Sequence, residues 1–182
     1  MSARSKRQAR RWIRGYRRAH EIHERMRRHG EDIFRSERFR SMKQYLQHGE
    51  VTVYKHSVNV AKASINLADR LHIKLQEREL IRGALLHDYF LYDWHIPEGQ
   101  DPGTLHGFHH PKVALRNALA EYELTEREKE IIRRHMWPMT LIPPRCREAW
   151  VVLAADKWVS LLETLHIYKG HGKTDQNGND GN

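Results

Sequence analysis

The segment Leu80–Tyr92, with the sequence LIRGALLHDYFLY, places two polar residues inside an otherwise apolar run. Its apolar residues recur at helical spacing, which predicts a mostly buried helix. Near the end of this run, His87 and Asp88 supply an imidazole nitrogen and a carboxylate. Burying a charged carboxylate beside an imidazole costs on the order of several kcal/mol unless a cationic partner compensates. The fold must therefore bring a partner to this pair, and a metal ion is the obvious candidate.

Other parts of the chain also predict helices. Apolar residues at helical spacing mark the ranges 51–71, 111–122 and 145–167, and Pro111 suits a first helical position. Thr125 and Glu128 form a capping box that opens a helix ending near His135. No segment shows the alternating pattern of a strand, and Pro and Gly residues between 93 and 104 predict a loop. The predicted fold class is all-α, a bundle of roughly six to eight helices.

A chain of 182 residues is long enough for one domain with tails. We expect a basic helical N-terminal arm over residues 1–30, the domain over 31–168, and a disordered tail without apolar residues over 169–182. The single cysteine, Cys146, cannot form an internal disulfide. No apolar run approaches the roughly 20 residues that span a bilayer, and the N-terminus lacks a secretory signal. These features predict a soluble cytoplasmic protein without a transmembrane segment.

The formal net charge of +9 is concentrated in the N-terminal segment. Residues 1–28 contain 11 Lys or Arg and two acids, whereas the remaining residues contain 21 basic and 21 acidic side chains. Any weak contact with a polyanion, either a nucleic acid or an acidic membrane, is therefore expected from residues 1–28. The alternative is a solvated helix without a partner.

Several predicted helices each offer a histidine or an aspartate to a common interior. The candidate metal ligands are His56, His87, Asp88, His110, His135 and Asp156. Nitrogen and oxygen donors of this kind suit Fe, Mn, Zn, Ni or Co. Six ligands exceed the need of one tetrahedral ion, so we expect two divalent transition-metal ions with Asp88 as the bridge. Each histidine, considered alone, could instead be a structural residue held by hydrogen bonds. Asp156 could simply form an ion pair with Lys157.

The order of these residues resembles the HD-domain superfamily of metal-dependent phosphohydrolases, over about residues 50–165. The surrounding strings YKHSVNVA, ALLHDYF, HHPKVA, RRHMWP and AADK strengthen the similarity. The two histidines between the HD pair and Asp156 resemble the subset that binds two metals. The Gly-Tyr-Pro signature of the cyclic-di-GMP phosphodiesterases is missing, because Met136, Trp137 and Pro138 follow His135.

The resemblance implies an HD-domain helical bundle in which His56, His87, Asp88 and Asp156 hold one metal. Asp88, His110 and His135 would hold the second metal, with His109 as the rival to His110. A hydroxide activated by the metals would be the nucleophile. Lys157 is a possible phosphate contact, and His106 and His109 could orient ligands, protonate a leaving oxygen or be purely structural.

The leading functional hypothesis is hydrolysis of a phosphate ester or anhydride in a nucleotide or another small phosphorylated metabolite. An alternative enzymatic hypothesis is a di-iron oxygenase with the same ligand arrangement. The non-enzymatic alternative is a regulatory or nucleic-acid-binding HD protein whose basic arm binds a polyanion.

Overall fold

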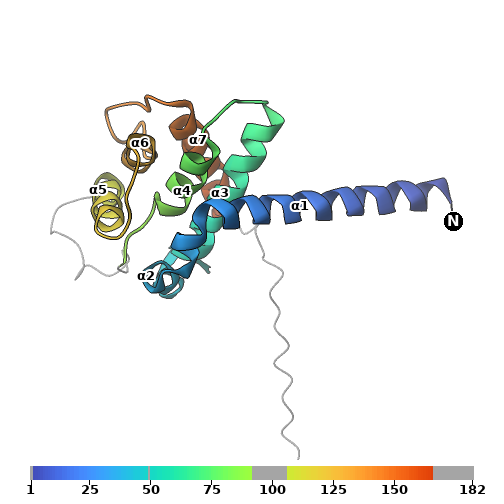
Figure 1. The fold of residues 1–182 in the computed structure, drawn as a ribbon, viewed down its shortest axis with the longest axis horizontal. Coiled ribbons are helices and arrows are strands. Elements are labelled where there is room, and N and C mark those ends of the chain that lie inside the picture. Colours follow the sequence, from blue (N-terminus) through green and yellow to red (C-terminus); the bar gives the residue numbers. More distant parts are fainter. Residues whose placement is uncertain (1, 49, 92–105, 166–182) are drawn as a thin grey trace, which may run out of the picture.

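The computed structural model describes residues 2–48, 50–91 and 106–165 (Figure 1). These residues form seven α-helices, one short 3-10 helix and one two-stranded sheet, which confirms the all-α prediction. The elements are α1 (Ala3–Arg35), α2 (Glu37–Ser41), η1 (Met42–Gln44), β1 (Leu46–His48), β2 (Val51–Thr52), α3 (Val53–Arg70), α4 (Glu77–Leu86), α5 (His106–Leu119), α6 (Glu126–Arg134) and α7 (Arg147–Thr164).

Helix α4 lies at the centre of the bundle, in contact with α1, α3, α5, α6 and α7. Every residue from Leu80 to Phe90 is buried, as the apolar sequence of this segment predicts. The helix ends at Leu86, so His87 occupies its C-cap position and Asp88 lies in the turn that follows. The chain therefore leaves the helix where the polar pair begins, in the middle of the core.

Helix α1 is anchored to the body by its C-terminal half. Ile22, Met26 and Ile33 are buried in the common core. Arg25 places its guanidinium between two carboxylates, 2.8 Å from Asp69 Oδ2 on α3 and 2.8 Å from Glu77 Oε2 on α4. The N-terminal half of the helix extends away from the body (Figure 1). The expected boundary at residue 30 falls within this helix, at a kink.

A buried ion-pair network ties α1, α4 and α6 together. Arg82 is 3% exposed and donates from Nε to Glu128 Oε1 at 2.9 Å and from Nη1 to Asp32 Oδ1 at 2.6 Å. Glu128 also completes the predicted capping box with Thr125, whose N–H donates to Glu128 Oε2 at 2.8 Å. Because both Arg82 and Glu128 are buried, losing one partner would leave an uncompensated charge in the core.

Two local features differ from the sequence-based expectations. Leu46 pairs with Thr52 in a small antiparallel sheet, whose strands are too short to show an alternating pattern. Pro111 lies inside α5, five residues after the helix begins at His106, although a proline within a helix removes one backbone donor and crowds the preceding turn. The predicted loop at 93–104 and tail at 169–182 lie outside the described residues.

Gly83 tests how tightly α4 and α6 are packed. A Cβ atom built on Gly83 would lie 3.0 Å from Ile131 Cβ and closer still to Ile131 Cδ1. We expect Gly83→Ala to lower the free energy of unfolding by about 1–3 kcal/mol, because overpacking outweighs the gain in helix propensity. Chemical denaturation measures this change.

Gly15→Ala is the matched control, since a Cβ atom at Gly15 meets nothing within 4 Å. Its free energy of unfolding should stay the same or rise by up to about 1 kcal/mol. Equal stability of the two variants would show that α4 and α6 are not in close contact at Gly83.

Candidate metal centre

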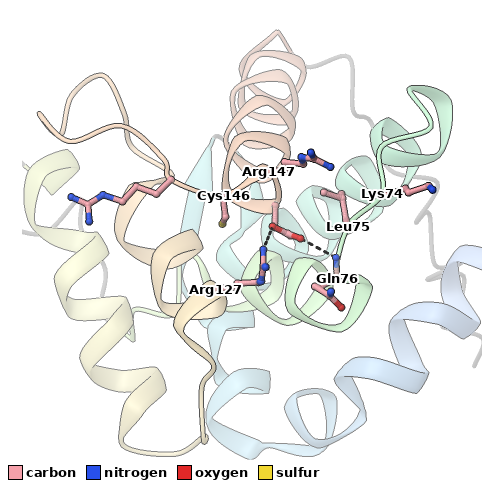
Figure 2. A pocket seen from close by; sticks show the side chains of 8 residues that line it. Lys74, Leu75, Gln76, Arg127, Cys146 and Arg147 are labelled. Carbon is pink, nitrogen blue, oxygen red and sulfur yellow. Dashed lines mark hydrogen bonds and ion pairs between the residues drawn. The ribbon is translucent and has the colours of Figure 1, made fainter.

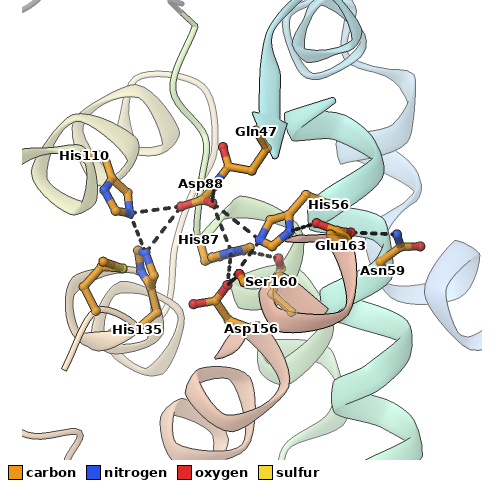
Figure 3. Close-up of polar contacts among 12 residues, drawn as sticks. Gln47, His56, Asn59, His87, Asp88, His110, His135, Asp156, Ser160 and Glu163 are labelled. Carbon is orange, nitrogen blue, oxygen red and sulfur yellow. Dashed lines mark hydrogen bonds and ion pairs between the residues drawn. The ribbon is translucent and has the colours of Figure 1, made fainter. Parts of the chain in front are cut away.

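The structure brings the six predicted ligands into one buried cluster (Figure 3). His56 comes from the first turn of α3, where the Thr52 side chain caps the helix by accepting from Lys55 N at 3.3 Å. The other five ligands are His87 and Asp88 after α4, His110 in α5, His135 at the C-cap of α6 and Asp156 in the middle of α7. Each side chain is at most 6% exposed.

The two carboxylate oxygens of Asp88 face two different pairs of histidines. Asp88 Oδ2 lies 3.4 Å from His87 Nε2 and 3.7 Å from His56 Nε2. Asp88 Oδ1 lies 3.2 Å from His110 Nε2 and 3.3 Å from His135 Nε2. Figure 3 shows Asp88 between the two pairs. A carboxylate in this position can bridge two cations, with one oxygen directed at each.

Asp156 adds a second carboxylate to the pair formed by His56 and His87. Its Oδ1 lies 3.2 Å from His56 Nε2 and 3.8 Å from His87 Nε2. On the other side of Asp88, His110 Nε2 and His135 Nε2 approach to 2.8 Å. The first group therefore has two nitrogens and two oxygens, and the second has two nitrogens and one oxygen.

Backbone carbonyls fix the orientation of two of the imidazoles. His87 Nδ1 lies 2.8 Å from Ala84 O, and His135 Nδ1 lies 2.9 Å from Ile132 O. A carbonyl can only accept, so Nδ1 carries the proton and, in the neutral ring, Nε2 presents a lone pair to the cluster. This tautomer is the one that a metal ion requires from a histidine that binds through Nε2.

Further polar side chains around the cluster were not identified from the sequence. Buried Glu163 accepts from His56 Nδ1 at 2.8 Å and from Asn59 Nδ2 at 3.0 Å. Gln47 on β1 donates from Nε2 to Asp88 Oδ2 at 2.8 Å. Helical spacing could have indicated Glu163, because it follows Asp156 by seven residues on α7 and so lies on the same face. No such signal existed for Gln47, which the small sheet brings to the cluster.

The imidazoles compensate for the buried carboxylates when no metal is bound. Burial favours the neutral form of His56, but hydrogen bonds with Asp156 and Glu163 outweigh it and raise its pKa to about 10. Burial also opposes charging of His87, and the nearby Asp88 carboxylate nevertheless raises its pKa. Positive charge is therefore favoured at this position in the core.

The two aspartates remain ionised because they lie beside the imidazoles. Burial favours the neutral acid, but the charge of His87 and contacts with other imidazoles hold the pKa of Asp88 well below its usual range. The pKa of Asp156 is likewise lowered, because the hydrogen bond with His56 outweighs burial. For His135, burial prevails and lowers the pKa to about 4, so this ring stays neutral with a lone pair available.

Two buried polar atoms in the cluster fit a metal ion as the missing partner. Within the described chain, His87 Nε2 and Asp88 Oδ1 are buried without a hydrogen bond of acceptable geometry. Two sets of ligand atoms, each within 4.8 Å of one another, could hold an ion: His56, His87 and Asp88, and Asp88, His110 and His135. Imidazole and carboxylate ligands together suit transition metals.

The remaining predicted site residues have different surroundings. Lys157 lies at the edge of the cluster, 45% exposed, with Nζ 3.0 Å from Asp156 Oδ2. The ion pair considered from the sequence is thus present, alongside the contacts of Asp156 with the histidines. His109 is half-buried and forms no hydrogen bond or ion pair with the described residues. His106 begins α5, and its side chain lies outside the described part of the chain.

A separate pocket of about 400 Å³, lined by several charged side chains, lies at the N-terminal ends of α4 and α7 (Figure 2). Glu148, 2% exposed, accepts there from Gln76 N at 2.9 Å and from Arg127 Nη1 at 3.1 Å. Like Glu163, it is a buried glutamate of α7 with both oxygens engaged. It has no part in the histidine cluster, which makes it a useful reference for Glu163.

A family model described as the HD domain matches residues 53–159, which is more than half of the chain. The matched range contains all six clustered ligand candidates. Searches of curated proteins and of solved structures gave no significant match. Among the described residues, no helix combines the length and apolar character needed to cross a membrane. From the match and the buried His and Asp cluster, the chain belongs to the HD-domain family, a superfamily of metal-dependent hydrolases.

Proposed function

We propose that this protein is a two-metal phosphohydrolase that cleaves a phosphate ester or anhydride in a nucleotide or another small phosphorylated metabolite. The observation that carries the proposal is the position of Asp88, whose two oxygens face separate pairs of imidazoles at 3.2–3.7 Å. If Asp88 only formed a structural ion pair, it would need just one of these two sets of imidazoles.

The chain offers a ligand set for each of two divalent ions. His56, His87, Asp88 and Asp156 would hold the first ion, and Asp88, His110 and His135 would hold the second. Such ions supply an activated water near neutral pH and neutralise charge on phosphoryl oxygens. We expect about two transition-metal ions per chain in protein purified without chelators, from the set Fe, Mn, Zn, Ni and Co.

The surrounding residues would position the ligands and the substrate. Gln47 and Glu163 hold Asp88 and His56 by hydrogen bonds, which lowers the cost of organising the site when a substrate binds. Lys157 is partly exposed beside Asp156, where its ammonium group could contact a phosphate. His106 and His109 remain candidates for orienting the metal ligands or protonating the leaving oxygen.

A screen of phosphorylated metabolites with Mn²⁺- or Fe²⁺-loaded protein tests the proposal directly. Release of phosphate or of a phosphomonoester is the expected result. Oxygen consumption that requires iron and fails with Mn²⁺ would instead support an oxygenase. A folded protein that takes up no metal and is not activated by either ion would contradict both enzymatic hypotheses.

Asp88→Asn removes the shared charge with little change in shape. We expect both ions to be lost or weakly held and activity to fall by about 100-fold or more, because the amide cannot bridge two cations. The fold should persist, because without the Asp88 charge the buried imidazoles beside it can lose their protons and become neutral. Elemental analysis and kinetics on the same preparation measure both effects.

The control for Asp88→Asn is Glu126→Gln, which removes one carboxylate from a side chain of α6 that is 82% exposed. Its metal content and activity should equal those of the wild type. Retention of two ions and of activity in Asp88→Asn would show that Asp88 is not a bridge.

Glu163→Gln tests how His56 is positioned. The amide can accept from only one of its two present donors, so we expect metal affinity to fall by about 10–100-fold while the fold is retained. Glu148→Gln is the matched control on the same helix, because Glu148 is equally buried but lies outside the cluster. A competitive chelator titration measures the affinities. Equal losses in the two variants would contradict a positioning role for Glu163.

A further inference from the structure

The N-terminal part of α1 is a charged helix without a partner in the described chain. Residues 1–20 contain seven arginines, one lysine and no acid, and the first acid along the chain is Glu21. From Arg7 to Arg17, no side chain forms a hydrogen bond or an ion pair with any described residue. Figure 1 shows this half of the helix projecting beyond the bundle. Seven arginines on one helix repel one another, so an anionic partner would stabilise the arm.

The bundle holds this arm in a fixed direction. Arg18 is the first residue to reach the body, with Nε 2.7 Å from Asn66 Oδ1. One turn further on, Ile22 enters the core, and Arg25 forms its paired contacts with Asp69 and Glu77. The exposed part of the helix is thus continuous with an anchored part. Less conformational entropy would therefore be lost when the arm binds a partner.

A row of arginines and two aromatic side chains lie on opposite faces of the arm. Arg7, Arg11 and Arg14 follow the spacing i, i+4, i+7, which places them in one row that ends at the body with Arg18. Arg10 and Arg17 lie beside this row. At 100° per residue, Trp12 and Tyr16 fall on the other side, where they are 75% and 74% exposed, whereas Ile13 lies beside Arg10 and Arg17.

We propose that the row of arginines binds the phosphate backbone of a nucleic acid. Successive members of the row lie about 4.5–6 Å apart along the helix axis, so they can contact phosphates along a strand or across a groove. Each guanidinium can donate two parallel hydrogen bonds to one phosphate, which suits a site with seven arginines and only one lysine.

An anionic membrane fits the same arm less well. A membrane-surface helix buries a wide apolar face, whereas residues 2–20 of this arm have only three large apolar side chains, Trp12, Ile13 and Tyr16. Burying this small apolar surface would add little to the attraction between the arginines and anionic lipid. A nucleic acid instead contacts the arginine face directly.

The proposed binding is independent of the metal centre, because no residue of the arm belongs to the histidine cluster. It is tested on the full-length protein by fluorescence anisotropy with labelled duplex RNA, single-stranded RNA and duplex DNA over a range of salt concentrations. Metal content and hydrolysis are measured on the same preparations, so failure of this proposal and failure of the proposed enzyme are distinguishable.

The decisive variant combines Arg7→Gln, Arg11→Gln and Arg14→Gln, since glutamine keeps the helix propensity while the charge is removed. We expect its affinity for at least one of the three nucleic acids to fall by about tenfold or more. The slope of log affinity against log salt should become shallower by about 2 to 3, because about one counterion is released for each phosphate neutralised. Far-UV circular dichroism checks that the helix persists.

The charge-matched control combines Lys112→Gln, Arg116→Gln and Arg133→Gln, three exposed cations of α5 and α6 on the other side of the bundle from the arm. Its nucleic-acid affinity should stay within about threefold of the wild-type value. Equal losses in both triple variants would overturn the proposal, because binding would then follow net charge alone. It would also be overturned by the absence of nucleic-acid binding, or by arginine-dependent sedimentation with phosphatidylglycerol vesicles but no binding to nucleic acid.

Discussion

The buried carboxylate of Asp88 is the constraint around which the rest of the structure is arranged. It lies at the end of the most buried helix, and both of its oxygens face imidazole nitrogens. A charge in this position is tolerated only with cationic compensation. Without a metal, His56 and His87 can provide it by binding protons, and with metals the same nitrogens would become ligands. The proposed centre therefore replaces one form of compensation by another at a site whose geometry is already set.

The scaffold supports this arrangement through elements far apart in the sequence. Ending α4 at Leu86 lets His87 and Asp88 project from one turn, and carbonyl contacts hold His87 and His135 in the tautomer that presents Nε2. The Arg82–Glu128 pair joins α4 to α6, the helix that carries His135. A fold that locks these helices together also limits how far the proposed ligands can move, which is what a preorganised site requires.

Much of the fold and of the cluster could be predicted from the sequence because both depend on local patterns. Helical periodicity located α3 and α7, and the Thr125–Glu128 capping box located α6, since these signals are contained within each segment. Residues such as Gln47 and Glu163 were missed, because their roles depend on which elements meet in space. The continuation of α1 past residue 30 could not be predicted either. Gly30 lies at a kink within this helix, where the lack of a side chain allows a close approach to Leu85.

Electron paramagnetic resonance of the Mn²⁺-loaded protein would test the shared role of Asp88 most directly. Two ions bridged by one carboxylate lie close enough to couple magnetically, whereas isolated ions give the spectrum of uncoupled Mn²⁺. The expected result is a coupled spectrum that appears as the second equivalent of metal binds. Saturation at one equivalent, or two equivalents with only uncoupled signals, would contradict a two-metal centre built around Asp88.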